Sequence, residues 1–259
     1  MTSDDEEDIS NGMFQEPNGY FEPEKPAKYT EYTLLTGQNL CLRLVGHNPL
    51  WGHYLWNGAQ VLSTYLQIHA PQLVYGKDVL ELGAGAGLPG LVAAILGARK
   101  VVVTDYPDVE LVENLEHNIY TCALLEQPAT NVKAEGYLWG SPAKSLLAHL
   151  SAPSQRFDVL LLADLLFNHS CHGALVTTIL NTLAHTPEAR ALVFFTPYRP
   201  WLLEKDMAFF DLCRERGLEV QKVVEEVMEK VMFEDDRGNE MLRRTVFGFE
   251  IRWRDEVDT

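Results

Sequence analysis

A glycine-rich turn between two apolar stretches constrains this chain more than any other feature. It lies in residues 78–105 (DVLELGAGAGLPGLVAAILGARKVVVTD), where the second apolar stretch, 101–104, ends on Asp105. This order predicts one βαβ half of a nucleotide-binding sheet, because glycines without a Cβ atom let a cofactor approach the backbone. Asp105 follows Gly85 by 20 residues. At that separation a carboxylate accepts hydrogen bonds from ribose hydroxyls.

Two classes of cofactor fit this turn. Residues 85–90 (GAGLPG) match the G-x-G-x-x-G pattern of dinucleotide-binding folds, and residues 81–87 (ELGAGAG) match the acidic turn of S-adenosylmethionine enzymes. Glu81 favours the second class, because a carboxylate repels a pyrophosphate but attracts the ammonium at the amino acid end of S-adenosylmethionine. The turn alone leaves both classes open.

The composition limits the compartment and the class of partner. The chain of 259 residues has a formal net charge of −16, which argues against nucleic acid because phosphate binding needs clustered Lys and Arg. A basic partner fits this charge better. The four cysteines are scattered, and no apolar run is long enough to span a membrane. We therefore expect a reduced, cytoplasmic, monomeric protein that binds neither nucleic acid nor membrane.

Alternating helical and strand patterns predict an α/β fold. Residues 1–30 are polar and contain several Pro and Gly, which is typical of an extended amino-terminal arm, and residues 31–259 form one predicted domain. The elements expected from apolar periodicity are a hairpin at 33–45, helices at about 55–66, 108–122, 173–184 and 201–216, and strands at 79–82, 101–104, 131–138, 157–163 and 191–196.

A carboxyl-terminal hairpin completes the predicted sheet. Residues 218–233 alternate in part and are followed by a turn (EDDRGN) and a strand at 245–253. Such a hairpin is typical of seven-stranded methyltransferases and unusual in dinucleotide folds. We therefore predict a seven-stranded, Rossmann-like class I methyltransferase sheet with a C-terminal antiparallel hairpin and an N-terminal extension, with S-adenosyl-L-methionine as the cofactor.

Several motifs resemble one family of methyltransferases. They lie at residues 14–20 (FQEPNGY), 49–59 (PLWGHYLWNGA), 79–90 (VLELGAGAGLPG), 101–108 (VVVTDYPD), 138–140 (LWG) and 164–170 (DLLFNHS). Over about residues 12–253 the chain resembles the seven-stranded S-adenosylmethionine methyltransferases of the protein-lysine branch. It is more closely similar to the fungal members that methylate the amino terminus and adjacent lysine of translation elongation factor 1-alpha, formerly labelled nicotinamide N-methyltransferases.

The resemblance implies where S-adenosyl-L-methionine binds. It puts Trp56 beside the methionine portion of the cofactor, Asp105 at the ribose and Trp139 against the adenine, where an indole face offers a flat apolar surface. The other implied cofactor-binding residues are the backbone cradle of Gly83, Ala84 and Gly85, and Ala163 at the end of the fourth strand. Without the family pattern, Trp56 is equally well explained as a core aromatic residue.

The stretch DLLFNHS supplies the catalytic candidates. Asp164 directly follows an apolar strand, where open α/β sheets present functional side chains. Phe167 and Asn168 are expected to border the methyl acceptor. The alternative for Asp164 is a cap on the next helix.

Two other groups of side chains follow the fourth and fifth strands. Tyr198 and Trp201 offer aromatic faces that can bind a methylated ammonium by cation–π attraction. Packing under the next helix is the alternative for Trp201. His169, Cys171 and His172 lack a fourth ligand at a suitable spacing, so we expect no metal site.

The motifs predict a protein N-methyltransferase, and the resemblance implies that its substrate is the amino-terminal glycine and adjacent lysine of elongation factor 1-alpha. The attacking amine must be neutral, and at pH 7 roughly one-tenth of an α-amine but only about 0.04% of a lysine is neutral. Two alternatives remain: a methyltransferase for small nicotinamide-type amines, and a lysine methyltransferase for another protein. A non-catalytic adaptor is disfavoured, because Glu81, the glycines and Asp105 are all present.

Overall fold

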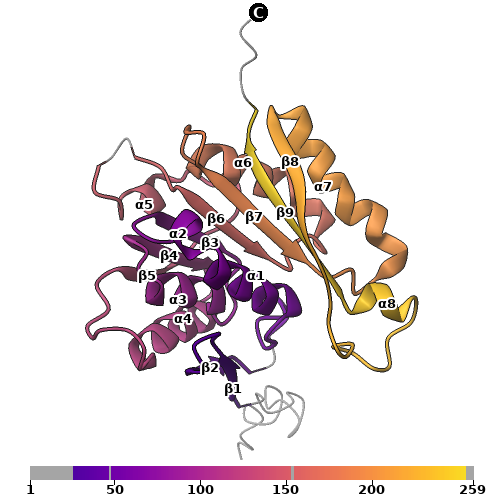
Figure 1. The fold of residues 1–259 in the computed structure, drawn as a ribbon, viewed down its shortest axis with the longest axis horizontal. Coiled ribbons are helices and arrows are strands. Elements are labelled where there is room, and N and C mark those ends of the chain that lie inside the picture. Colours follow the sequence, from indigo (N-terminus) through magenta and orange to yellow (C-terminus); the bar gives the residue numbers. More distant parts are fainter. Residues whose placement is uncertain (1–25, 47, 153–154, 255–259) are drawn as a thin grey trace, which may run out of the picture.

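A twisted sheet of seven strands runs through the part of the chain that the computed structural model describes, residues 26–46, 48–152 and 155–254 (Figure 1). The motif at residues 14–20 and most of the predicted arm at 1–30 lie outside the described residues. The elements follow in the order β1 (Lys28–Thr33), β2 (Asn39–Leu44), α1 (Asn57–Ile68), α2 (Ala70–Leu73), β3 (Asp78–Leu82), α3 (Leu88–Ile95), β4 (Lys100–Asp105), α4 (Val109–Thr121), β5 (Val132–Gly136), α5 (Lys144–Leu147), β6 (Val159–Ala163), η2 (His169–Cys171), α6 (His172–Thr182), β7 (Arg190–Phe195), η3 (Pro200–Leu202), α7 (Leu203–Glu215), β8 (Leu218–Val227), α8 (Glu240–Arg243) and β9 (Thr245–Trp253).

The seven strands are arranged in the order β5-β4-β3-β6-β7-β9-β8. Strands β3 to β7 run parallel, with Val79 of β3 opposite Val101 on one side and Val159 on the other, whereas β9 is antiparallel to both of its neighbours. The predicted seven-stranded sheet with a C-terminal antiparallel hairpin is confirmed. Chain order reverses between β3 and β6, so their carboxyl ends flank the crevice where open α/β sheets bind ligands.

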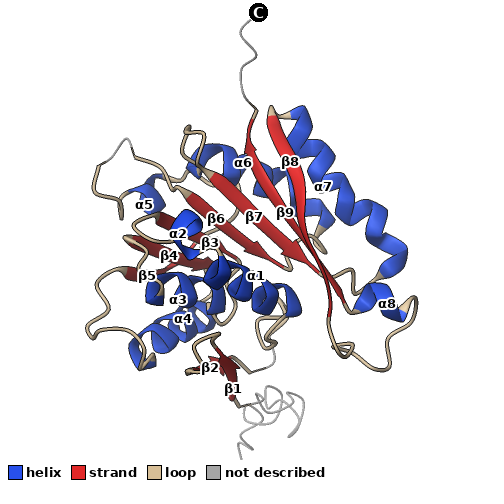
Figure 2. Ribbon diagram, viewed as in Figure 1, coloured by secondary structure: helices blue, strands red, loops and turns tan. Residues whose placement is uncertain are grey.

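Helices cover both faces of the sheet (Figure 2). On one face α1 and α3 bury Leu62 and Leu91 in an apolar core, and on the other face α6 and α7 bury Leu175 and Phe209 in a second core. Strand β6 is apolar along its whole length because both of its sides are covered. Its carboxyl end is thereby fixed between two packed layers.

The antiparallel pair β1–β2 confirms the predicted hairpin but starts earlier than expected, at Lys28. The earlier residues join the strand because its side chains alternate between the two faces, and this alternation buries Tyr32. The Tyr32 hydroxyl lies 2.9 Å from the Thr64 hydroxyl of α1. Asn118 of α4 fixes the second strand, since its Oδ1 accepts the Arg43 N–H at 2.8 Å and its Nδ2 donates to the Ala86 carbonyl at 3.0 Å. The hairpin is therefore tied to the glycine turn that precedes α3.

Two helix ends follow clear local sequence signals. Helix α4 begins after Asp108, whose side chain accepts the N–H groups of Glu110 and Leu111. Helix α7 is followed by Gly217 at a φ of 84°, a left-handed conformation that suits glycine. Helix α1 begins without such a signal, because its N-cap residue Trp56 makes no side-chain capping bond. Within the described ranges, no helix is long and apolar enough to cross a membrane.

Candidate functional site

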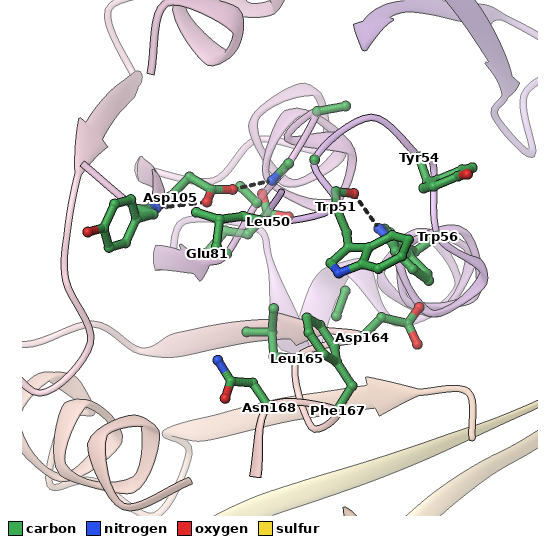
Figure 3. Close-up of a pocket in the computed structure, with 18 of the residues that line it drawn as sticks. Leu50, Trp51, Tyr54, Trp56, Glu81, Asp105, Asp164, Leu165, Phe167 and Asn168 are labelled. Carbon is green, nitrogen blue, oxygen red and sulfur yellow. Dashed lines mark hydrogen bonds between the residues drawn. The ribbon is translucent and has the colours of Figure 1, made fainter. Parts of the chain in front are cut away.

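A cavity of about 390 Å³ opens at the carboxyl ends of β3, β4 and β6 (Figure 3). This volume lies in the range of about 300–1,000 Å³ that is usual for small-molecule sites. Residues from all the predicted cofactor-binding and catalytic motifs line the cavity: Trp56, Glu81, Gly83, Ala84, Gly85, Asp105, Trp139, Ala163, Asp164, Phe167 and Asn168. Two of the aromatic residues predicted for the site, Tyr198 and Trp201, lie outside this lining.

The turn between β3 and α3 forms one wall of the cavity. Gly83 has a φ of 59°, and a Cβ atom there would lie 2.5 Å from Leu165 Cδ2 and 3.1 Å from Trp139 Cζ2. No side chain fits at this position without moving both neighbours. The Ala84 N–H donates to the Thr104 carbonyl at 2.9 Å, which fixes the turn against β4.

Asp105 ends β4 with its carboxylate held at the edge of the cavity (Figure 3). Its Oδ2 accepts the Gly85 N–H and its Oδ1 accepts the Tyr106 N–H, both at 2.7 Å. Burial raises the pKa of this carboxyl, while the two N–H donors act in the opposite direction. Each oxygen keeps a second lone pair, so Asp105 can accept further hydrogen bonds from a ligand without rearranging.

Glu81 is almost fully buried beneath the first turn of α3. Its Oε2 accepts the Gly90 N–H at 2.8 Å, a bond between strand and helix that the sequence did not indicate. Burial raises the pKa of Glu81 to about 8. Because Glu81 also lines the cavity, a bound ammonium would favour its ionised form and lower that pKa.

Trp139 and Ala163 also line the cavity. Trp139 is partly buried and packs on the second apolar core. The next residue, Gly140, has a φ of 82° and donates its N–H to the Thr178 hydroxyl of α6 at 2.8 Å. This glycine lets the chain turn away from the cavity directly after the indole. Ala163 leaves the end of β6 open to the cavity.

Asp164 joins three elements where β6 ends beside the cavity. Its backbone is left-handed, with a φ of 53°, and its side chain is buried. Oδ2 accepts the Gly58 N–H of α1 at 2.6 Å, and Oδ1 accepts the Thr196 N–H after β7 at 2.7 Å. Asp164 therefore caps α1, not the helix that follows it. Burial raises its pKa to about 7, against the effect of both donors.

Four aromatic rings cluster beside Asp164. Trp56 lies at the centre, 5.6 Å from Tyr54, 5.1 Å from Tyr198 and 5.9 Å from Phe233 between ring centroids. All three contacts are edge-on, the geometry that aromatic pairs prefer. The Trp56 Nε1–H donates to the Trp51 carbonyl at 3.2 Å, which orients the indole (Figure 3).

Tyr198 reaches this end of the site from the segment after β7. Its hydroxyl accepts the Asn57 N–H at 3.3 Å, and burial raises its pKa well above the usual range, with Asp164 adding to the shift. Tyr198 lines a second cavity of about 20 Å³, whose wall shares Asp164 and Phe167 with the large one. It thus stands behind Asp164, away from the large cavity.

Several residues of the site were not identified from the sequence. Those lining the large cavity include Leu50, Trp51, Tyr54, Tyr106, Leu138, Leu165 and Cys171. Most of them lie beside predicted residues within the same motifs, and this proximity in the sequence could have identified them. Phe233 had no such signal, because residues 218–233 were assigned to a strand whereas β8 ends at Val227.

Two sequence-based expectations concern side chains near these strand ends. Trp201 is 62% exposed and lines neither of the two cavities. Among the described residues, no group of three or more His, Cys, Asp or Glu side chains is arranged to hold a metal ion.

Comparison with known proteins gives a consistent match. A family model described as lysine methyltransferase matches residues 38–216. The protein N-terminal and lysine N-methyltransferase efm7 of Emericella nidulans is 47% identical over 256 residues, which cover 97% of this chain and 99% of that protein. Its namesake in Neurospora crassa is 49% identical over 260 residues, covering 98% and 92%. The solved structure of Pyrococcus horikoshii TYW2 in complex with MeSAdo shares the fold, with 15% identity, a TM-score of 0.51 and coverage of 86% and 71%.

Proposed function

The chain belongs to the lysine methyltransferase family, and we propose that it methylates the amino-terminal α-amine and the adjacent lysine of translation elongation factor 1-alpha. The family's cofactor is S-adenosyl-L-methionine. One observation carries the proposal: relatives named protein N-terminal and lysine N-methyltransferase match this chain over almost its whole length. The resemblance described in the sequence analysis implies the elongation factor itself.

The residues around the large cavity fit S-adenosyl-L-methionine. The cradle at Gly83 has no room for a side chain, Asp105 has acceptor capacity for ribose hydroxyls, and Trp139 offers an apolar face for the adenine. Glu81 supplies a carboxylate for the ammonium of the amino acid end. We propose these roles for Gly83, Asp105, Trp139 and Glu81.

Methyl transfer needs positioning more than covalent chemistry from the protein. S-adenosyl-L-methionine supplies a methyl group bound to a sulfonium sulfur, and this sulfur departs as a neutral thioether, so the protein need not activate a leaving group. The protein's task is to hold a neutral amine in line with that group and to exclude water. Phe167 and Asn168 border the cavity on this side, and Trp56 provides an aromatic face for the developing methylammonium. Asp164 holds the start of α1 in place beside them.

The order of methylation follows from amine ionisation. An α-amine is neutral far more often at pH 7 than a lysine, so the chain end is the easier first acceptor. A carboxylate near the amine raises the amine's pKa, and for this reason we assign Asp164 to positioning and not to general-base catalysis. The proposal also covers a cytoplasmic location and a monomeric enzyme, as the sequence predicts.

The test uses labelled S-adenosylmethionine and a peptide with the first residues of elongation factor 1-alpha. The free peptide is expected to gain label. The same peptide with an acetylated amino terminus should lose its α-methylation and much of its lysine methylation, as read by mass spectrometry. Unchanged incorporation after acetylation would identify a simple lysine methyltransferase. Label only on a small amine or on another protein in a cell lysate would support the corresponding alternative.

A further inference from the structure

The turn between β6 and α6 carries the three predicted catalytic side chains, and Leu165 and Leu166 anchor its first part in the second apolar core. Asp164 begins the turn in a left-handed conformation, which costs a residue other than glycine about 1 kcal/mol. Phe167 is 40% exposed. The Asn168 Oδ1 accepts a hydrogen bond from the Ser170 hydroxyl at 2.8 Å, a contact within the turn itself. The positions of Phe167 and Asn168, which follow these leucines, therefore depend on contacts from other elements.

Two backbone carbonyls of this turn are bound from outside. The His172 Nε2–H of α6 donates to the Leu166 carbonyl at 2.8 Å, and burial lowers the pKa of His172, which keeps the ring neutral. Arg199, from the segment after β7, donates its Nη2–H to the Phe167 carbonyl at 2.7 Å. These bonds fix the backbone on both sides of the Phe167 nitrogen.

A hydrogen bond between His169 and the buried Asp206 holds the far end of the turn. The His169 Nε2 lies 2.7 Å from Asp206 Oδ1 of α7, and Asp206 is only 5% exposed. Burial raises the pKa of Asp206, whereas His169, Arg199 and His172, which all face it, act in the opposite direction. His169 directly follows Asn168, so the pair fixes the chain next to the side chain that borders the acceptor.

We propose that His169, His172, Arg199 and Asp206 are positioning residues that hold Phe167 and Asn168 against the methyl acceptor. The three contacts come from α6, α7 and the segment after β7, and none involves the strands that carry the cofactor cradle. The histidines of the DLLFNHSCH stretch, which lack the ligand spacing of a metal site, thereby gain a function. This inference rests on the proposed methyl transfer and adds the residues that orient its acceptor side.

Asp206→Ala is the central test, because it removes the acceptor for His169 without touching either cavity's catalytic side chains. We expect kcat to fall about tenfold or more, since small misplacements of reacting groups cost up to about 10² in rate. The Kd of S-adenosylmethionine should change less than about twofold, because the cradle is untouched. Asp206→Asn keeps an oxygen that can accept the His169 N–H and should restore most of the turnover.

A matched control lies on the same helix. Asp211 is 73% exposed and pairs with Arg214 at the surface, so Asp211→Ala makes the same change of charge and should leave kcat unaltered. Arg199→Ala provides a second variant at an exposed residue, where folding is not at risk, and should lower kcat in the same way as Asp206→Ala. A fall in kcat and in cofactor affinity by equal factors, or a loss of thermal stability with normal kcat, would overturn the proposal.

Hydrogen exchange tests the same inference without any acceptor. In Asp206→Ala the amide of Cys171, bonded to the Asn168 carbonyl at 3.0 Å, should exchange faster, whereas the amide of Ala84 in the cradle should not. This result is expected even if the elongation factor peptide proves not to be the substrate, so the two proposals fail separately. Equal exchange at Cys171 in the wild type and the variant would refute the positioning role.

Discussion

Gly58→Ala should damage this protein at a helical position where the same change normally helps. Gly58 is the second residue of α1, and a Cβ atom there would lie 2.5 Å from Asp164 Oδ2, 2.9 Å from Asp164 Cγ and 3.0 Å from the Phe194 carbonyl oxygen. The carbonyl belongs to β7 and cannot move away. Asp164 must therefore shift, which breaks its bonds to the Gly58 and Thr196 N–H groups.

The expected cost can be built from these contacts. Overpacking costs about 1–3 kcal/mol, and loss of a hydrogen bond to a charged group costs about 1.5–3 kcal/mol. The greater helix propensity of alanine returns about 1 kcal/mol. The free energy of unfolding should thus fall by between about 1.5 and 5 kcal/mol. Turnover should fall as well, because Asp164 leaves its place beside the acceptor.

Gly173 provides the control for this prediction. It is the second residue of α6, and a Cβ atom there meets nothing within 4 Å. Gly173→Ala should therefore raise stability by a few tenths to about 1 kcal/mol through helix propensity alone. Urea unfolding followed by circular dichroism measures both variants. If Gly58→Ala is as stable as Gly173→Ala, Asp164 does not hold the start of α1, and the reasoning about this end of the site is wrong.

Three further substitutions test the carboxylates of the site. Asp105→Ala should weaken S-adenosylmethionine binding about 10- to 150-fold, since a hydrogen bond to a charged group contributes about 1.5–3 kcal/mol. Unchanged affinity in calorimetric titration, or tight NADH binding by the wild type, would contradict the cofactor assignment. Because burial raises the pKa of Glu81 to about 8, the free energy of unfolding of the wild type should fall as pH rises from about 5 to about 8. In urea unfolding, Glu81→Gln should lose less stability over this range. An equal dependence of stability on pH in both proteins would argue against the buried acid. Asp164→Asn should keep most cofactor affinity but lower kcat, and normal turnover with a lower Tm would limit Asp164 to a structural role.

Most of the fold follows from local patterns in the sequence. The strands were predictable because their apolar runs are short and bounded by turn residues, as in β6, where every residue is apolar. The glycine turn was predictable because its glycines stand close together in the sequence, and the structure shows that a Cβ atom at Gly83 would meet Leu165 and Trp139. Asp108 and Gly217 marked helix ends by their own chemistry. In each case the information lies within a few residues of the feature.

The missed features depend on residues far apart in the chain. The bond from the Gly58 N–H to the Asp164 carboxylate joins residues that are 106 positions apart, and the sequence did not predict it. Phe233 joins Trp56 and Tyr198 only because β9 brings the hairpin back beside β7. No local pattern encodes such contacts. They follow from the strand order, which one sequence specifies only through the completed fold.

The position of β9 between β7 and β8 affects how the protein is made. During synthesis β8 leaves the ribosome before β9, and among the described strands β9 is its only partner. The parallel strands β3 to β7 can assemble first, while β8 has an unpaired edge that invites association with other chains. A nascent chain stalled before Thr245 would contain the whole cofactor cradle but lack the strand that seats Phe233 against Trp56. While such a fragment stays soluble, it should bind the cofactor poorly or not at all. The acceptor side of the site should be the last part of the enzyme to form.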